Sequence, residues 1–118
     1  MKERTKEFAL RIVRLYSALP KSAVAQTLGK QVLRSGTSVG AHYRKAVRSR
    51  SDAEYVSKIE GALQELEETG YWLELLADAG VCRPGTVAEL RGEADELTAI
   101  LVTCAKKAKT RKGLKNQE

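Results

Sequence analysis

Apolar residues recur every three or four positions in four segments of the chain, which is the spacing of one face of an α-helix. These segments are residues 4–19, Ser22 to residue 47, Ser51 to residue 79, and Thr86 to residue 109. No segment alternates apolar and polar positions as a half-buried strand would, and no internal repeat is visible. The pattern therefore predicts an all-α fold.

The boundaries between these segments carry residues that stop and start helices. Pro20 ends the first segment, because proline lacks the backbone N–H that a helix interior requires. Ser51 with Glu54, and Thr86 with Glu89, match the S/T-x-x-E pattern of a capping box. Connections this short place successive helices side by side in opposite directions. We expect an antiparallel, up-down-up-down four-helix bundle.

The middle of the second segment, residues 35–40, is unusual for a helix because it consists mainly of glycine, serine and threonine. Each glycine costs about 1 kcal/mol of helix stability relative to alanine. A chain keeps residues such as Gly36 and Gly40 where another helix must approach closely. The third segment offers bulky side chains, Trp72 among them. We expect a structural helix–helix contact between the glycine-bearing helix and the tryptophan-bearing helix.

The short connection after residue 47 also sets the register of the second and third helices. In an antiparallel helical hairpin, Arg34 lies level with Leu66 and within reach of Glu65 or Glu68. We therefore expect Arg34 and Glu68 to belong to a structural polar contact between these helices, with no chemical role.

Charge is distributed unevenly along the 118 residues. Residues 1–50 carry twelve Lys and Arg against two acidic residues, whereas residues 51–80 carry one Lys against eight acidic residues. Residues 106–118 add six basic residues and one glutamate. We divide the chain into a bundle, residues 1–109, and a basic flexible tail, residues 110–118. The opposite charges can meet within one chain or between copies, and a contact between unlike surfaces can close into a ring.

The cysteines and the N-terminus bear on the compartment. Cys82 and Cys104 lack the spacing of a metal site, so free thiols in a reducing environment are the simplest interpretation. Arg83 follows Cys82 and could lower the pKa of that thiol. The charged N-terminus leads into no apolar signal segment, and no run reaches the length of a membrane span. We expect a cytoplasmic protein with no membrane contact.

Two motifs stand in the second and third segments. The first reads Gln-x-x-Arg-Ser-x-x-Ser-Val-Gly-Ala, and the second combines Ser-x-x-Glu-Tyr with Glu-Thr-x-x-Trp-Leu. The residues are Gln31, Arg34, Ser35, Ser38, Val39, Gly40 and Ala41, then Ser51, Glu54, Tyr55, Lys58, Glu68, Thr69, Trp72 and Leu73. In these positions the chain resembles small bacterial four-helix bundle proteins related to the ribosomal-RNA intervening-sequence protein. His42 and Lys45 stand where that family usually has Asn and Glu, so a polar site formed there in relatives would be altered or lost here.

The resemblance implies a left-handed four-helix bundle that assembles as a ring-like homopentamer. Members of the family are similar to nucleic-acid-associated proteins encoded inside ribosomal-RNA intervening sequences. Distant relatives are accessory variability proteins of diversity-generating retroelements, which contact nucleic acid and a reverse transcriptase through a basic surface. The implied partners are therefore further copies of the chain, RNA or DNA, and a reverse transcriptase or another nucleic-acid enzyme.

Two basic clusters are the candidate nucleic-acid-binding residues. They are Arg44, Lys45, Arg48 and Arg50 at the end of the second helix, and Lys106, Lys107, Lys109, Arg111 and Lys112 near the C-terminus. Neither cluster contains interleaved aromatic residues, so the expected contact is with the phosphate backbone and is not sequence-specific. The alternative for both clusters is a solvated helix end whose cations offset the helix dipole.

Little in the chain indicates catalysis. His42 is the only histidine, and Glu67 and Glu68 point about 100° apart on a helix, which does not suit paired-carboxylate chemistry. We expect a non-enzymatic protein without a metal or cofactor that binds nucleic acid. One alternative is a protein–protein adaptor or scaffold that binds no nucleic acid. Another is an enzyme subunit with a site formed between chains.

Overall fold

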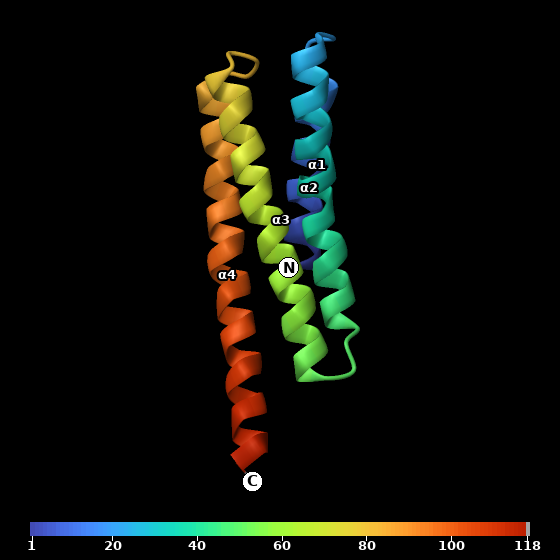
Figure 1. Cartoon of the computed structure of the whole chain (residues 1–118), viewed down its shortest axis with the longest axis vertical. Coiled ribbons are helices and arrows are strands. Elements are labelled where there is room, and N and C mark those ends of the chain that lie inside the picture. The colour runs from blue at the N-terminus through green and yellow to red at the C-terminus, as the bar shows by residue number, and fades with distance from the viewer. Residues whose placement is uncertain (118) are drawn as a thin grey trace.

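Four long helices make up almost the entire chain in the computed structural model, which forms a narrow rod of 58 × 21 × 20 Å (Figure 1). They are α1 (Lys2–Ser17), α2 (Ala23–Val47), α3 (Asp52–Asp78) and α4 (Pro84–Gln117). The structure describes the backbone of residues 1–117 and the side chains of residues 1–111. Within this part of the chain there is no strand, so the predicted all-α class is confirmed.

The contacts between α2 and α3 run in opposite directions along the two helices. The Arg34 guanidinium lies 3.5 Å from the Glu65 carboxylate and also pairs with Glu68. Further along α2, the His42 ring lies against Gly61, which comes earlier in α3. The two helices are therefore antiparallel, and the predicted reach of Arg34 to Glu65 and Glu68 is confirmed. The left-handed twist of the bundle stays a prediction.

Two predicted helix starts are confirmed by hydrogen bonds from the first turn. The Ser22 hydroxyl accepts a bond from the Ala25 N–H (3.2 Å), and the Ser51 hydroxyl accepts one from the Glu54 N–H (3.1 Å). Such caps satisfy N–H groups that have no partner within the helix. At the far end of α3, Gly80 adopts a φ of +75°, a conformation that side chains disfavour, and it turns the chain toward α4.

The start and the extent of α4 differ from the prediction. The helix begins at Pro84, so Thr86 lies inside its first turn and does not cap it. Proline suits the first helical position because its missing N–H would be unpaired there anyway. The helix also continues past Lys109 to Gln117, because Thr110 to Lys112 contain no strong helix breaker. The division of the chain at residue 109 stays a prediction.

The expected contact between α2 and the tryptophan-bearing α3 does form, but the glycines of α2 do not belong to it and face α1 instead. A β-carbon at Gly36 would lie 2.8 Å from Cγ1 of Ile12, and one at Gly40 would lie 3.1 Å from Oγ1 of Thr5. Real β-carbons do not approach other atoms as closely as 2.8 Å, so glycine at position 36 permits the contact of α1 with α2. Trp72 of α3 is only partly buried and packs against the edge of the core.

The first helix is attached to the bundle mainly through α2 and meets α4 at few points. One of these points is Arg4, whose guanidinium donates to both carboxylate oxygens of Glu93 (3.0 and 2.8 Å) and to Glu96 (3.1 Å). These bonds hold the pKa of the Glu93 carboxyl below its ordinary value. A planar guanidinium that binds a carboxylate through two bonds fixes direction as well as distance, so this pair aligns the start of α1 with α4.

Candidate nucleic-acid interface

The first predicted cluster projects from the last turns of α2 and from the turn that follows. Arg44, Lys45, Arg48 and Arg50 are all exposed. Among the described residues, none of their four side chains forms an ion pair with an acidic group. The four cations are therefore available to an external partner.

The second predicted cluster is divided by the fold into two kinds of cation. Lys106 and Lys107 are exposed and have no ion pair within the described part of the chain. Lys109 instead lies 3.0 Å from Glu60, and Arg111 lies 3.4 Å from Asp52, so both are tied to α3. The side chain of Lys112 lies outside the described residues. Two of the four described members are therefore structural ion-pair partners, which linear spacing did not indicate.

The ends of α2, α3 and α4 meet where these clusters lie. Figure 1 shows the α2–α3 turn and the C-terminal part of α4 at the same end of the rod. Tyr43 of α2 and Tyr55 of α3 both lie near Cys104 of α4. Burial at this junction, together with a hydrogen bond to Cys104, raises the pKa of Tyr55 to about 12. Both basic clusters thus belong to one end of the molecule, which we call the basic end.

The acidic third helix is largely neutralised inside the chain. Five of its carboxylates pair with cations of α2 or α4: Glu65 and Glu68 with Arg34, Glu74 with Arg91, Glu60 with Lys109, and Asp52 with Arg111. Six exposed cations of the basic end have no such partner among the described side chains: Arg44, Lys45, Arg48, Arg50, Lys106 and Lys107. Internal ion pairs therefore engage five of the eight acidic residues of α3 and leave these six cations of the basic end without a partner.

The helix dipole offsets only a small part of this charge. A helix C-terminus carries the equivalent of roughly −0.5 elementary charge. Four cations stand at or just beyond the C-terminus of α2, and two of them, Arg44 and Lys45, lie in its last turn. Compensation of the dipole therefore explains a fraction of one charge, and the remaining field at the basic end favours an anionic partner.

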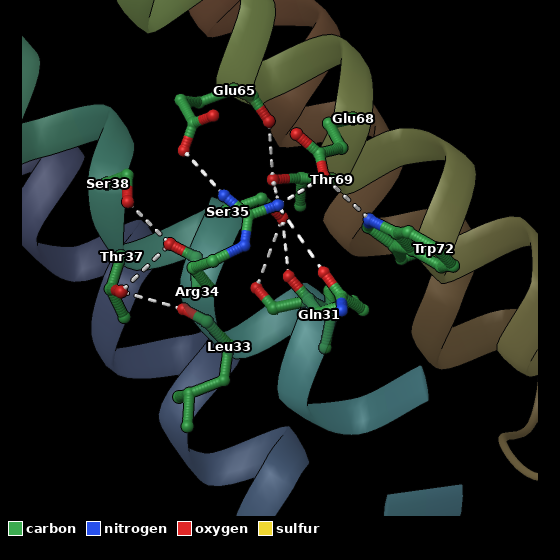
Figure 2. A network of polar contacts seen from close by, with 11 residues as sticks. Gln31, Leu33, Arg34, Ser35, Thr37, Ser38, Glu65, Glu68, Thr69 and Trp72 are labelled. Carbon is green, nitrogen blue, oxygen red and sulfur yellow. Dashed lines mark hydrogen bonds and ion pairs between the residues drawn. The ribbon is translucent and has the colours of Figure 1, made fainter. Parts of the chain in front are cut away.

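The predicted polar contact between α2 and α3 forms a network with a buried centre. Figure 2 shows Glu65 and Glu68 of α3 turned toward Arg34, and the indole N–H of Trp72 donates to Glu68 (3.1 Å). Beneath this layer, the Thr69 hydroxyl donates to the Ser35 hydroxyl across the helices (2.9 Å). Both hydroxyl-bearing residues are fully buried. The motif residues at this position thus align two helices by directional bonds.

His42 packs into a space that Gly61 leaves open. A β-carbon at Gly61 would lie 2.9 Å from Nδ1 of His42, and this nitrogen is buried without a hydrogen-bond partner among the described residues. Sequence reasoning missed this contact, although a glycine level with His42 in the facing helix was a visible signal. Lys45, the other departure from the family pattern, is exposed at the basic end.

The surroundings of Cys82 work against activation of its thiol. Both are free, and partial burial raises the pKa of the Cys82 thiol, so the expected lowering by Arg83 is wrong. Among the described side chains, no group of three or more His, Cys, Asp or Glu residues could hold a metal ion. No helix in the described part of the chain has an apolar stretch long enough to cross a membrane.

Comparison with known proteins places this architecture among small helical bundles. A crystallised protein of unknown function from the S23 ribosomal protein family of Bacteroides thetaiotaomicron VPI-5482 has the same fold, with a TM-score of 0.84. It is 37% identical, and the alignment covers 89% of this chain and 97% of that chain. Residues 1–103 match the family described as 23S rRNA-intervening sequence protein. The chain belongs to this family, which confirms the resemblance found in the sequence. No curated protein matches it.

Proposed function

We propose that this protein is a non-enzymatic, cytoplasmic assembly protein whose basic end binds the phosphate backbone of nucleic acid. The observation that carries the proposal is the group of six exposed cations at one end of the molecule that have no ion-pair partner among the described side chains, although five carboxylates of the acidic α3 are paired with other cations. Cations of this kind bind nucleic acid largely by releasing condensed counterions, without reading base sequence. The name of the family points to the same class of partner.

The proposal includes assembly of several copies into a ring-like homopentamer. In such a ring, the basic ends of neighbouring copies would add their fields along one rim, so that each copy contributes a few phosphate contacts to a larger surface. The number five rests on the resemblance to the family. A reverse transcriptase or another nucleic-acid enzyme would meet the protein on the nucleic acid that both bind.

Filter binding with duplex DNA and with structured RNA tests the proposal. We expect both ligands to be retained at low ionic strength, and retention to fall steeply as salt is added. Lys106→Gln combined with Lys107→Gln should weaken binding of both. These substitutions are preferable to deletion of the tail, because deletion would also remove the fully buried Ala108.

A matched control uses the opposite end of the rod. Lys21 and Arg83 are exposed cations in the α1–α2 and α3–α4 connections, away from the basic end. Lys21→Gln with Arg83→Gln removes the same charge and should leave binding unchanged. If neither ligand is retained at low salt, the nucleic-acid proposal fails and the adaptor alternative takes its place. Equal loss in both double variants would show a non-specific effect of net charge and would equally reject the basic end as the site.

A further inference from the structure

A groove of about 520 Å³ runs along the outer seam of α3 and α4. Its floor is apolar, formed by Leu63, Leu66, Ala94 and Val102, and its edges carry Glu67, Glu74, Asp95 and Arg91. Glu74 and Arg91 form an ion pair (3.8 Å) with each other. Glu67 and Asp95 have no ion-pair partner among the described side chains, so the groove keeps a negative rim over an apolar floor.

Gly70, which lines this groove, is unexplained by contacts within the chain. Four other mid-helix glycines have a neighbour that a β-carbon would crowd: Gly29, Gly36, Gly40 and Gly61. At Gly70 a β-carbon would meet nothing within 4 Å. Glycine inside a helix is destabilising relative to alanine. Gly92 is equally open but does not line the groove. The missing side chain at Gly70 therefore matters because it leaves room for another helix to approach the groove.

The same chain carries a face of matching character on the outer side of α1. Leu10 and Val13 are 39% and 38% exposed, and together with the exposed Lys6 they lie on one side of the helix. This face is apolar and carries Lys2, Glu3 and Lys6, which leave it one positive charge, whereas the charged residues of the groove are three acids and one arginine. Because no residue of α1 lines the groove, one copy can offer its groove to one neighbour and its α1 face to another.

We infer that the α3–α4 groove receives the outer face of α1 from a second copy of this chain. The inference rests on the proposed ring assembly and names the surfaces that would form it. The contact joins two unlike surfaces, so it passes from copy to copy in one direction and closes into a ring when the rotation allows.

Two blocking variants test the contact by sedimentation velocity. Gly70→Leu fills the groove, and Leu10→Glu places a like charge opposite its negative rim. Each variant should sediment as a folded monomer of 13.0 kDa at concentrations where the wild type is assembled. Gly92→Leu is the control for the first variant, because Gly92 is also mid-helix and open but does not line the groove. Val47→Glu is the control for the second, because Val47 is 45% exposed and lies outside both surfaces. Both controls should assemble like the wild type.

Mixing the two blocking variants tests the direction of the contact. The Leu10→Glu copies keep an intact groove, and the Gly70→Leu copies keep an intact α1 face. The mixture should therefore yield a 1:1 dimer of the two variants and no larger species. A mixture that stays monomeric overturns the inference, as does a Gly70→Leu variant that assembles like the wild type. That second result would leave the proposed ring standing on other surfaces. A wild-type protein that is monomeric at micromolar concentration would instead reject the ring and this contact together.

Discussion

Replacing Gly36 by leucine should destabilise the protein by about 1–3 kcal/mol through overpacking of the α1–α2 contact. A β-carbon at this position would lie 2.8 Å from Cγ1, 3.0 Å from Cγ2 and 3.3 Å from Cβ of Ile12. These atoms form the branched part of a fully buried side chain, which cannot swing aside as the end of a flexible chain could. Leucine improves helix propensity by nearly 1 kcal/mol, and this gain offsets only part of the cost.

Gly92→Leu isolates the propensity term. A β-carbon at Gly92 would meet nothing within 4 Å, so this variant should gain roughly 0.5–1 kcal/mol and lose nothing to packing. Urea denaturation followed by circular dichroism measures both changes, with all variants at one protein concentration because association shifts apparent stability. The two substitutions should change the free energy of unfolding in opposite directions, and the two variants should differ by about 1.5–4 kcal/mol, the sum of the cost at Gly36 and the gain at Gly92.

A second background makes the test specific to Ile12. Ile12→Ala alone should cost about 2–5 kcal/mol, as for other buried large-to-small substitutions. It also opens the space that leucine needs, so Gly36→Leu should be much less costly in this background, or stabilising. If Gly36→Leu lowers the free energy of unfolding equally in both backgrounds, α1 does not pack on the glycines of α2. A Gly36→Leu single variant that is as stable as the wild type would refute this packing as well.

Three other contacts give further predictions. Thr69→Val removes the hydroxyl that donates to Ser35 while nearly keeping the volume, and denaturation should show a loss of about 0.5–1.5 kcal/mol. Glu93→Gln should lower stability at neutral pH, and the difference from the wild type should vanish on acidification. The pKa of Glu93 is depressed by hydrogen bonds from Arg4, so this contribution is present above the unfolded value and is lost as pH falls through the folded value. The pKa of Tyr55 is raised to about 12, and burial also raises the pKa of Tyr43, so an ultraviolet pH titration should show phenols that ionise above pH 10, with Tyr55 among them at about 12. Stability should fall as pH rises from about 10 to about 12, because the unfolded phenol loses its proton first.

The features that were predictable from sequence depend on neighbours along the chain. Ser22 and Ser51 cap their helices as their positions indicate, because a cap requires only a hydroxyl and the N–H three residues later. The reach of Arg34 to Glu68 also followed, since a short turn between two helices fixes their register. These rules involve one helix or one hairpin and need no knowledge of the remaining fold.

The features that the sequence did not reveal depend on which faces of the four helices pack against one another. A glycine such as Gly36 indicates close approach without naming the partner, and the structure assigns it to α1. The basic residues near the C-terminus looked alike, yet Lys109 and Arg111 are tied to acids of α3 that lie 49 and 59 positions away in the chain. Gly70 lies within the tryptophan motif, and the sequence does not tell whether it packs against another helix of the chain. The structure shows that it does not, because a β-carbon there would meet nothing within 4 Å.

The central claim is that the basic end binds nucleic acid through its phosphate backbone, and the salt dependence of duplex DNA binding tests it most directly. The measurement compares the wild type with Arg44→Gln combined with Arg48→Gln, two exposed cations in the last turn of α2 and at its C-cap. We expect the logarithm of the affinity to fall linearly with the logarithm of the salt concentration, and the slope of the variant to be shallower by about 0.9 for each phosphate contact removed. An identical slope in the variant, or a wild type whose affinity ignores salt, would contradict this expectation.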